Sequence, residues 1–290
     1  MSAEIDIVIV NWNAGDMLRD CVQSALETGG QALGRVIVVD NGSVDHSLDH
    51  LPDDPRLLVI ETRENLGFGR ACNRGASLAQ GRYVLFLNPD TRLYPTTLMD
   101  VLAYMDSKEG QKVGVCGIRL IEDDGAIQHH TTAFPTSRDI YRVDAFRTDF
   151  DHRTDRRVSH VIGAFYFIRR ALFEQLGGFD ERFFVYFEDL DLSYRVHQAG
   201  WSIQYLASTA AYHKGGGTSD AVKARRLSYS LTSRLRYARK HFSWPGNLLV
   251  LATTFLIEPP LRLLRAARRR SAREARETLA AYAMLLTRAR

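Results

Sequence analysis

Three acids, Glu188, Asp189 and Asp191, stand directly after a run of aromatic residues that extends from Phe179 to Phe187. A carboxylate is costly to remove from water, so acids beside an apolar surface tend to be raised in pKa, paired with a cation, or used in chemistry. The alternative is the acidic first turn of an ordinary helix, which the helix dipole favours. Other features of the chain favour chemistry.

Two more acids follow short apolar runs that are typical of β-strands. Asp40 ends the run from Val36 to Val39, and Asp90 follows the run Tyr83–Leu87 by way of Asn88 and a proline. Either acid can simply belong to a turn. Asp40 can also accept hydrogen bonds from a base or ribose. Asp90 can ligate Mg²⁺ or Mn²⁺, because a cation bridged to a diphosphate needs only one or two protein carboxylates.

A glycine-rich segment and a late histidine complete the candidate chemistry. Residues 64–75 open a helix with backbone amides that can meet an anion. The segment nearly matches the dinucleotide-binding fingerprint, but Cys72 occupies the third glycine position, which argues against a nicotinamide site. His213 precedes three glycines and can be structural, or it can complete a metal site with Asp90.

The elements that must position these residues follow an α/β rhythm. Apolar β-branched runs alternate with helical periodicity through the first 120 residues, which predicts a mostly parallel sheet with helices on both faces. In such sheets ligands bind beyond the carboxyl ends of the strands, where Asp40 and Asp90 lie. The predicted strands are Ile5–Val10, Val36–Val39, Leu57–Ile60, Tyr83–Leu87, Val113–Leu120 and Trp201–Leu206, with a further apolar segment at Val161–Ile168. The predicted helices are Met17–Leu26, Gly69–Ala79, Pro95–Tyr104 and Asp189–Gln198, and 122–157 is an irregular polar excursion.

Together these segments resemble the inverting glycosyltransferases of family 2. That resemblance implies the nucleotide-binding GT-A fold, a Rossmann-like mixed sheet with helices on both faces. It covers about Ile5 to Ser219, and the NLGFG…CN and LNPDT segments are most similar to the rhamnosyltransferase-like branch that builds bacterial cell-surface polysaccharide. It rests on the ordered segments Ile7–Asn13, Asp40–Ser43, Asn65–Asn73, Leu87–Thr91, Gly163-Ala164, Gly177–Asp180, Phe187–Leu192 and His213.

The resemblance also implies roles for individual residues. Asp189 matches the catalytic base, and Asp90 matches the last acid of the metal-binding DxD motif, with His213 helping to hold the metal. Asn88 stands where that motif places its first Asp, which leaves one carboxylate instead of two. Asp40 matches the acid that binds the nucleotide base. The remaining nucleotide-sugar-binding candidates are Asn11, Asn13, Asn65, Gly67, Asn73, Asn88 and Glu188.

The implied activity is a metal-dependent transfer of a sugar from a nucleotide diphosphate donor, with Mg²⁺ or Mn²⁺ as cofactor. dTDP-rhamnose is the first expectation for the donor, and UDP-linked sugars are its chief rival. The acceptor is a glycan or a polyprenyl-linked sugar. The alternative is a catalytically silent module that binds polyanions or membranes on the same fold. The enzyme needs Asp90, Asp189 and His213 together. Binding through the basic tail should not depend on any of these three residues.

Charge divides the chain into an acidic body and a basic tail, predicted as domains 1–220 and 221–290. Residues 1–222 hold 22 Lys+Arg against 31 Asp+Glu, whereas residues 223–290 hold 16 against 3. A basic, amphipathic, helical tail predicts contact with an anionic membrane surface. The alternatives are a helical cap or a homodimer contact. Nucleic acid is not expected, because no recognition motif accompanies the charge.

Two further features of the sequence bear on where the protein works. The apolar run Leu248–Ile257 has ten residues, too few to cross a bilayer, and Pro259-Pro260 is expected to break the chain after it. The odd count of three cysteines fits a reducing cytosol, and the N-terminus has acids where a signal peptide needs basic residues. The sequence therefore predicts a cytoplasmic protein, peripheral on the inner face of the plasma membrane.

Overall fold

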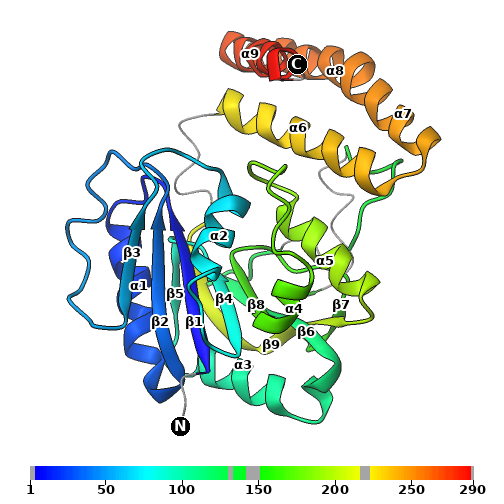
Figure 1. The fold of residues 1–290 in the computed structure, drawn as a ribbon. Helices are drawn as coiled ribbons and strands as arrows, with labels where there is room; N and C mark the ends of the chain where they lie inside the picture. Colours follow the sequence, from blue (N-terminus) through cyan, green and yellow to red (C-terminus); the bar gives the residue numbers. More distant parts are fainter. Residues whose placement is uncertain (1–3, 130–132, 142–150, 216–222, 289–290) are drawn as a thin grey trace.

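The computed structural model describes residues 4–129, 133–141, 151–215 and 223–288, and these form a mixed α/β body followed by helices (Figure 1). The glycines at 216 and 217 and the predicted helix start at Ala221 lie outside the described residues. The body is built on a nine-stranded sheet. Its strands are β1 (Ile5–Asn11), β2 (Leu33–Asp40), β3 (Leu57–Glu61), β4 (Tyr83–Leu87), β5 (Thr91–Leu93), β6 (Val113–Ile121), β7 (Arg156–Val158), β8 (Phe165–Arg169) and β9 (Ser202–His213).

The strand order is β3-β2-β1-β4-β8-β6-β9-β5, with β7 also paired to β9. The first half is parallel: β1 lies between β2 and β4, and β2 pairs with β3. β8 then runs antiparallel to both β4 and β6. The sheet is therefore mixed, as predicted. Because β8 reverses direction, its amino end meets the carboxyl ends of β1, β2 and β4.

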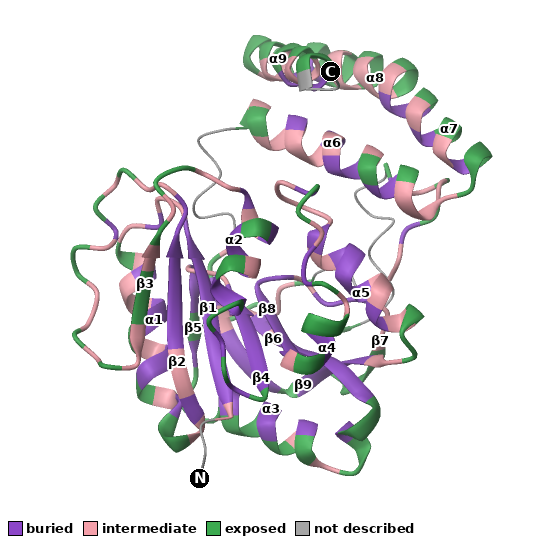
Figure 2. Cartoon of the chain, viewed as in Figure 1, coloured by how far each residue is buried: buried purple, intermediate pink, exposed green. Residues whose placement is uncertain are grey.

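Helices cover both faces of the sheet, and the alternation of residues along β1 shows why. Ile5, Ile7 and Ile9 face a core shared with two helices, whereas Val8 and Val10 face the opposite core, and all five are buried. Figure 2 shows the central strands buried between these layers, whereas β3 at the edge of the sheet is largely exposed. The first layer contains α1 (Asp16–Thr28) and α3 (Thr97–Asp106), and the second contains α2 (Phe68–Ala76), α4 (Arg170–Gln175) and α5 (Glu188–Gln198).

The strand predicted at Trp201–Leu206 is longer than expected, since β9 has 12 residues and ends at His213. A register shift against β6, between the pairs of Leu206 and Ala210, lets the strand continue. His213 is thus the last residue of a strand and does not follow one. β5 pairs antiparallel with this extension, and Thr91 lies opposite His213.

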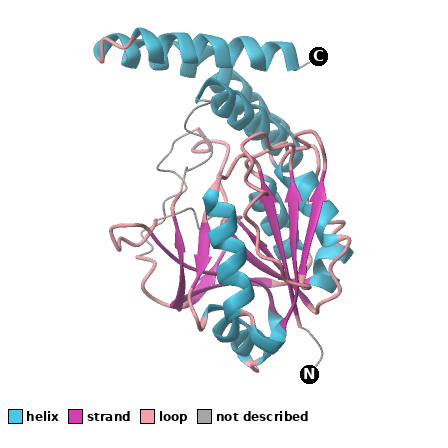
Figure 3. Cartoon of the chain, turned by 90° about the vertical axis from the view of Figure 1, so that its left-hand side faces the viewer, coloured by secondary structure: helices cyan, strands magenta, loops and turns pink. Residues whose placement is uncertain are grey.

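The C-terminal helices lie beyond the carboxyl ends of the parallel strands (Figures 1 and 3). They are α6 (Lys223–His241), α7 (Trp244–Ala252), the π-helical turn η5 (Thr253–Ile257), α8 (Glu258–Arg268) and α9 (Ala272–Arg288).

The expectation that Pro259-Pro260 breaks the chain is wrong. The prolines occupy the first turn of α8, where their missing N–H groups cost little, and the π-helical turn precedes them. Trp244–Arg268 therefore forms one helix of 25 residues. By length and composition it could cross a membrane, so the argument from a ten-residue run does not hold.

Candidate active site

Asn11 and Asp40 meet at the carboxyl end of the sheet, because β1 and β2 pair these two residues in register. Both side chains are buried. The Asn11 amide donates to Asp40 Oδ1 at 2.7 Å and to Ser47 Oγ at 2.7 Å, and the Ser43 N–H donates to Asp40 Oδ2 at 3.1 Å. The structure thus brings the two predicted residues together and shows that Asn11 orients the acid.

The neighbouring loops at this edge are shaped by Asn13, Asn65 and Gly67. Asn13 has a left-handed backbone, and its Oδ1 accepts from the Val44 N–H at 2.8 Å. Asn65 Oδ1 accepts from the Gly67 N–H at 3.0 Å. Gly67 has φ +88°, and a Cβ there would lie 2.4 Å from the carbonyl oxygen of Phe184, so only glycine fits. These three residues hold the loop beside the Asp40 site.

The Asn73 side chain binds the backbone of a different loop. Its amide donates to the Phe179 carbonyl at 2.9 Å and accepts from the Phe179 N–H at 2.8 Å. A Cβ on Gly178 would lie 2.5 Å from Asn73 Oδ1, so the amide is packed closely against this turn. The structure therefore places Asn73 as a clamp on the turn that precedes the aromatic run, apart from the Asn11–Asp40 pair.

Asp90 and His213 form a second polar corner, because the pairing of β5 with β9 brings them together. Asp90 Oδ1 lies 3.4 Å from His213 Nε2, and both side chains are less than a tenth exposed. Asn88 Nδ2 lies 3.5 Å from the same nitrogen. On the other side of the ring, Gln128 Oε1 lies 2.6 Å from His213 Nδ1 and can accept its proton. That contact leaves the Nε2 lone pair facing Asp90.

This corner fits a hard divalent cation bound largely by a donor's phosphates. One carboxylate oxygen and one imidazole nitrogen lie 3.4 Å apart, and an outer hydrogen bond to Gln128 fixes the ring, as at many metal sites. In the part of the chain that the structure describes, no cluster of three or more His, Cys, Asp or Glu side chains is placed to hold a metal. Phosphate and water would have to supply the other ligands.

Asp189 is connected to this corner through a short segment of the chain. Its Oδ2 accepts from the Gly163 N–H at 2.8 Å and its Oδ1 from the Leu190 N–H at 2.8 Å. The following residue, Ala164, accepts through its carbonyl from the Asn88 N–H at 3.1 Å, so one short segment links the Asp189 carboxylate to the Asn88–Asp90 turn. The Asp189 side chain remains 18% exposed.

Glu188 has a contrasting environment. It is 5% exposed, and its Oε2 has no hydrogen-bond partner in the described structure. Burial, together with the charge of Asp189, raises the pKa of Glu188 well above its ordinary value, which favours the uncharged acid. The Glu188 Cβ lies 3.6 Å from the position that a Cβ on Gly69 of α2 would take, so the side chain packs beside the start of that helix. Its predicted contact with the donor stays a prediction.

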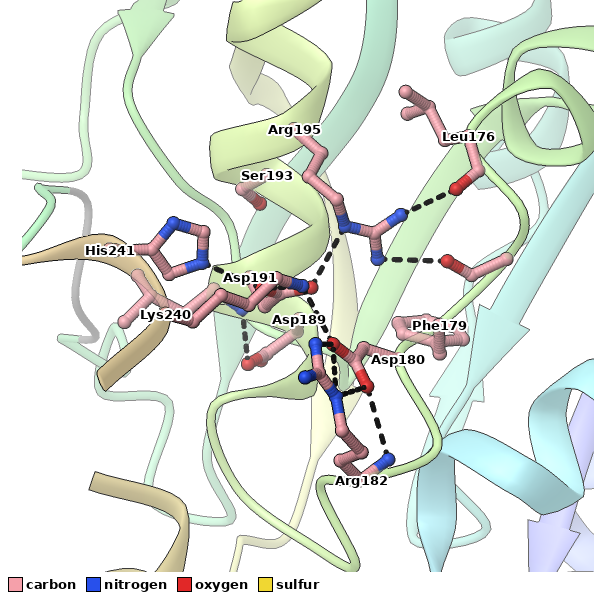
Figure 4. A network of polar contacts seen from close by, with 12 residues as sticks. Leu176, Phe179, Asp180, Arg182, Asp189, Asp191, Ser193, Arg195, Lys240 and His241 are labelled. Carbon is pink, nitrogen blue, oxygen red and sulfur yellow. Dashed lines mark hydrogen bonds and ion pairs between the residues drawn. The ribbon is translucent and has the colours of Figure 1, made fainter. Parts of the chain in front are cut away.

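Asp191, the third acid of this group, is fully buried at the centre of an ion cluster (Figure 4). Its carboxylate lies 2.8 Å from Arg195, 2.6 Å from Lys240 and 2.7 Å from His241. Burial alone would raise the pKa of Asp191, but hydrogen bonds from His241 and Lys240 and the charge of Arg195 hold it below its ordinary value. Because Lys240 and His241 belong to α6, the cluster ties the C-terminal helices to α5.

We expect Asp191→Asn to lower the free energy of unfolding by about 3 kcal/mol at neutral pH, because it removes the buried charge that Arg195, Lys240 and His241 share. The folded-state pKa of Asp191 lies below its unfolded value, so its contribution is present above the unfolded pKa and is lost as the pH falls through the folded pKa. Urea unfolding against pH measures this. Asp189→Asn, two residues away in the same first turn of α5 and partly exposed, is the control. Equal stability losses in the two variants would contradict the cluster's role.

Two features around Asp189 are not apparent from the sequence. Tyr186 and Phe187 both have left-handed backbones, with φ +68° and +70°, a strained turn that starts α5 abruptly at Glu188. His160 is buried with Nε2 4.0 Å from Asp189 Oδ2 and Nδ1 3.1 Å from Ser193 Oγ. Burial lowers the pKa of His160, although Asp189 opposes this, so a neutral ring lies behind the carboxylate.

Comparisons with known proteins agree with this geometry. The sequence matches the family described as glycosyl transferase family 2 over residues 6–177, and the chain belongs to that family. An N-acetylglucosaminyl-diphospho-decaprenol L-rhamnosyltransferase of Mycobacterium tuberculosis is 26% identical over 84% of this chain and 87% of its own length. Rhamnosyltransferase WbbL of Escherichia coli is 28% identical over 61% of this chain and 69% of its own.

Solved structures confirm the fold class. A Pyrobaculum calidifontis mannosyltransferase in complex with GDP-Man and Mn²⁺ aligns over 99% of this chain and 88% of its own, with a TM-score of 0.58 and 17% identity. GalNAc-T7 with UDP, GalNAc and Mn²⁺ aligns over 82% of this chain and 50% of its own, with a TM-score of 0.59 and 17% identity. The protein is therefore a family 2 glycosyltransferase with the GT-A fold, and it is similar to bacterial rhamnosyltransferases.

Proposed function

We propose that the protein transfers rhamnose from dTDP-rhamnose, with inversion, to a sugar carried on a polyprenyl diphosphate during bacterial cell-surface polysaccharide synthesis. The observation that carries the proposal is the hydrogen-bonded link from the partly exposed Asp189 carboxylate, through the Gly163-Ala164 segment, to the turn that holds Asp90 against His213. The names of the two rhamnosyltransferase relatives support the donor sugar, and the mycobacterial relative's name supports the acceptor class.

In this proposal each corner of the site binds one part of the reactants. Asp40, oriented by Asn11, accepts hydrogen bonds from the nucleoside. Asp90 and His213 would hold Mg²⁺ or Mn²⁺, which when bound neutralises charge on the diphosphate leaving group. The Gly163 and Leu190 N–H groups fix the direction of the Asp189 carboxylate. Asp189 accepts the proton of the acceptor hydroxyl, which attacks the anomeric carbon from the face opposite the diphosphate.

The donor is tested by incubating the full-length protein and Mn²⁺ with a matched panel of dTDP-rhamnose, UDP-linked sugars and GDP-mannose. The acceptor is N-acetylglucosaminyl-diphospho-polyprenol. We expect turnover with dTDP-rhamnose to exceed the others by at least about tenfold, since a site that hydrogen-bonds its substrate discriminates strongly. Faster turnover of a UDP-linked sugar than of dTDP-rhamnose would assign that sugar as the donor. No transfer from any donor would favour the silent binding module.

We also propose that the protein lies on the surface of the membrane, and the C-terminal helices support this part of the proposal. Glu258 is held by Arg234 of α6 and by Arg262, and Thr254 and Ala266 are buried on the same side. The other side of the Trp244–Arg268 helix is exposed and apolar. Its exposed residues include Trp244, Leu248, Leu256, Ile257, Leu261 and Leu264. A helix fixed to its neighbour on one side and apolar on the other suits lying in the membrane surface, with nearby arginines on anionic headgroups.

We expect the full-length protein to co-sediment with vesicles of phosphatidylglycerol and phosphatidylcholine, and to leave them as salt rises, because screening shortens the field to roughly 10 Å at 0.1 M. Leu256→Gln with Leu261→Gln should release it, because burying each leucine is worth about 2 kcal/mol. The matched control is Leu279→Gln with Leu286→Gln on α9. Absence of wild-type binding to anionic vesicles, with a dimer in solution, would assign the exposed face to self-association.

A further inference from the structure

A groove of about 540 Å³ opens between the catalytic body and α6, outside the site described above. One wall comes from the start of α2 and the loop after Phe179, and the other from one side of α6 at positions 229, 232, 233 and 236, which share a helical face. The groove is lined by, among others, Arg70, Arg182, Phe184, Tyr229, Thr232 and Arg236.

The charge in this groove is predominantly positive. Arg70 pairs with Glu181 at 3.0 Å and Arg182 with Asp180 at 2.5 Å, and the Arg236 guanidinium donates to the carbonyl of Arg182. Arg70 and Arg182 remain 53% and 69% exposed, so a ligand can reach them. Three guanidinium groups outnumber Glu181, the acid among the lining residues. Planar guanidinium groups bind phosphate oxygens in pairs, so the groove suits a phosphate-bearing ligand.

The groove is separated from Asp189 by the segment around Phe68. The Phe68 N–H donates to the carbonyl of Phe184 on the groove wall at 2.7 Å. The Phe68 ring lies 3.5 Å from the position that a Cβ on Gly163 would take, which is also 3.5 Å from Asp189 Oδ2. Phe68 therefore connects the groove wall with the surroundings of the Asp189 carboxylate.

The groove also has an apolar wall directed toward the C-terminal helices. Phe184 and Tyr229 stack with ring centroids 4.6 Å apart, and Tyr229 belongs to α6. α6 packs against the apolar helix Trp244–Arg268 through Arg234 and Glu258. A ligand with a charged head and an apolar chain would therefore find cations and an aromatic surface in the groove, and α6 connects the groove to the exposed apolar helix.

We propose that this groove binds the diphosphate of the polyprenyl diphosphate-linked acceptor, with Arg70 and Arg236 as its principal cations. The inference rests on the proposed function for the identity of the acceptor. The diphosphate is held by guanidinium groups of α2 and α6, the first prenyl units lie against Phe184 and Tyr229, and the acceptor sugar passes Phe68 toward Asp189. The groove thereby selects acceptors that carry a diphosphate.

Binding is measured by calorimetry with farnesyl diphosphate on the full-length protein, with dTDP and Mn²⁺ present at saturation so that the donor site is filled. The variant is Arg70→Gln with Arg236→Gln. Its matched control is Arg74→Gln with Arg239→Gln, two exposed arginines on the same helices that do not line the groove. We expect the variant to bind about tenfold more weakly or worse, because each lost contact is a charge-assisted hydrogen bond, and the control to match wild type.

Three binding outcomes would overturn the assignment. They are equal affinity of variant and wild type, an equal loss in the control, and binding of inorganic pyrophosphate as tight as that of farnesyl diphosphate, which would indicate a free-phosphate site. In transfer assays the variant should raise KM for the lipid-linked acceptor, with kcat and the KM for donor unchanged. Arginine-dependent binding without any sugar transfer by wild type would refute the proposed function alone. Sugar transfer that is unchanged when both arginines are replaced would refute the groove as the acceptor site, and would leave the proposed function intact.

Discussion

Asp189→Asn is expected to lower kcat by about 100-fold or more while leaving donor affinity nearly unchanged. The substitution removes the group that accepts the acceptor's proton, yet an asparagine oxygen can still accept from the Gly163 N–H that now holds the carboxylate. The local structure should therefore persist. Initial rates at saturating donor and acceptor, with calorimetric titration of dTDP, separate the two effects.

Glu188→Gln is the matched control for this prediction. Glu188 is the adjacent acid, and its burial favours the uncharged form, which glutamine imitates in shape and charge. We expect this variant to keep most of the wild-type activity. Near wild-type turnover in Asp189→Asn would show that another group is the base. A large loss in Glu188→Gln with activity kept in Asp189→Asn would transfer the role to Glu188.

Asp90→Ala is expected to lower kcat/KM on the order of 100-fold and to remove the metal dependence of donor binding, because charge neutralisation by a bound cation is worth several kcal/mol at the leaving group. In wild type, dTDP should bind more tightly with Mn²⁺ than with EDTA. In the variant the two affinities should converge. Calorimetry under both conditions measures the difference directly.

Gln128→Leu tests the same corner through the histidine ring. Without the 2.6 Å contact from Gln128 to His213 Nδ1, the proton of the ring is no longer fixed on that nitrogen. Outer contacts of this kind are worth about 10- to 100-fold in metal affinity, so we expect a loss of that size. Asp124→Asn, an exposed residue in the same loop, is the control. Equal dTDP affinity with and without metal in wild type would contradict a cation site at Asp90 and His213.

Parallel strands bring their carboxyl ends to one edge, so Asp40 and Asp90 could be placed at that edge from their positions alone. Asn11 entered through the family resemblance, and the structure pairs it with Asp40. The roles of these residues stay predictions. A metal site formed by Asp90 and His213 was also predicted. The sequence did not show which strands bring these two residues together. A three-residue strand at Thr91–Leu93 and the extension of β9 through small residues bring them together, and neither has a strong strand pattern.

Contacts between distant segments were not predictable in the same way. Gln128 lies in a polar excursion without periodicity, and nothing in its spacing indicates a histidine partner 85 residues away. Lys240 and His241 were predicted to be part of a basic tail, but both side chains contact the carboxylate of the buried Asp191. Local patterns report which face of an element is apolar, whereas an ion cluster between elements depends on how they pack.

The stereochemistry of the transferred sugar tests the central claim most directly. Wild-type protein, dTDP-rhamnose, Mn²⁺ and N-acetylglucosaminyl-diphospho-polyprenol should give a rhamnosylated product whose anomeric configuration, measured by NMR, is opposite to that of the donor. Asp189→Asn should form the same product far more slowly. A product that retains the donor's configuration would contradict single displacement by an acceptor that Asp189 deprotonates. Absence of any glycosidic product would contradict the account of this site as a transferase centre.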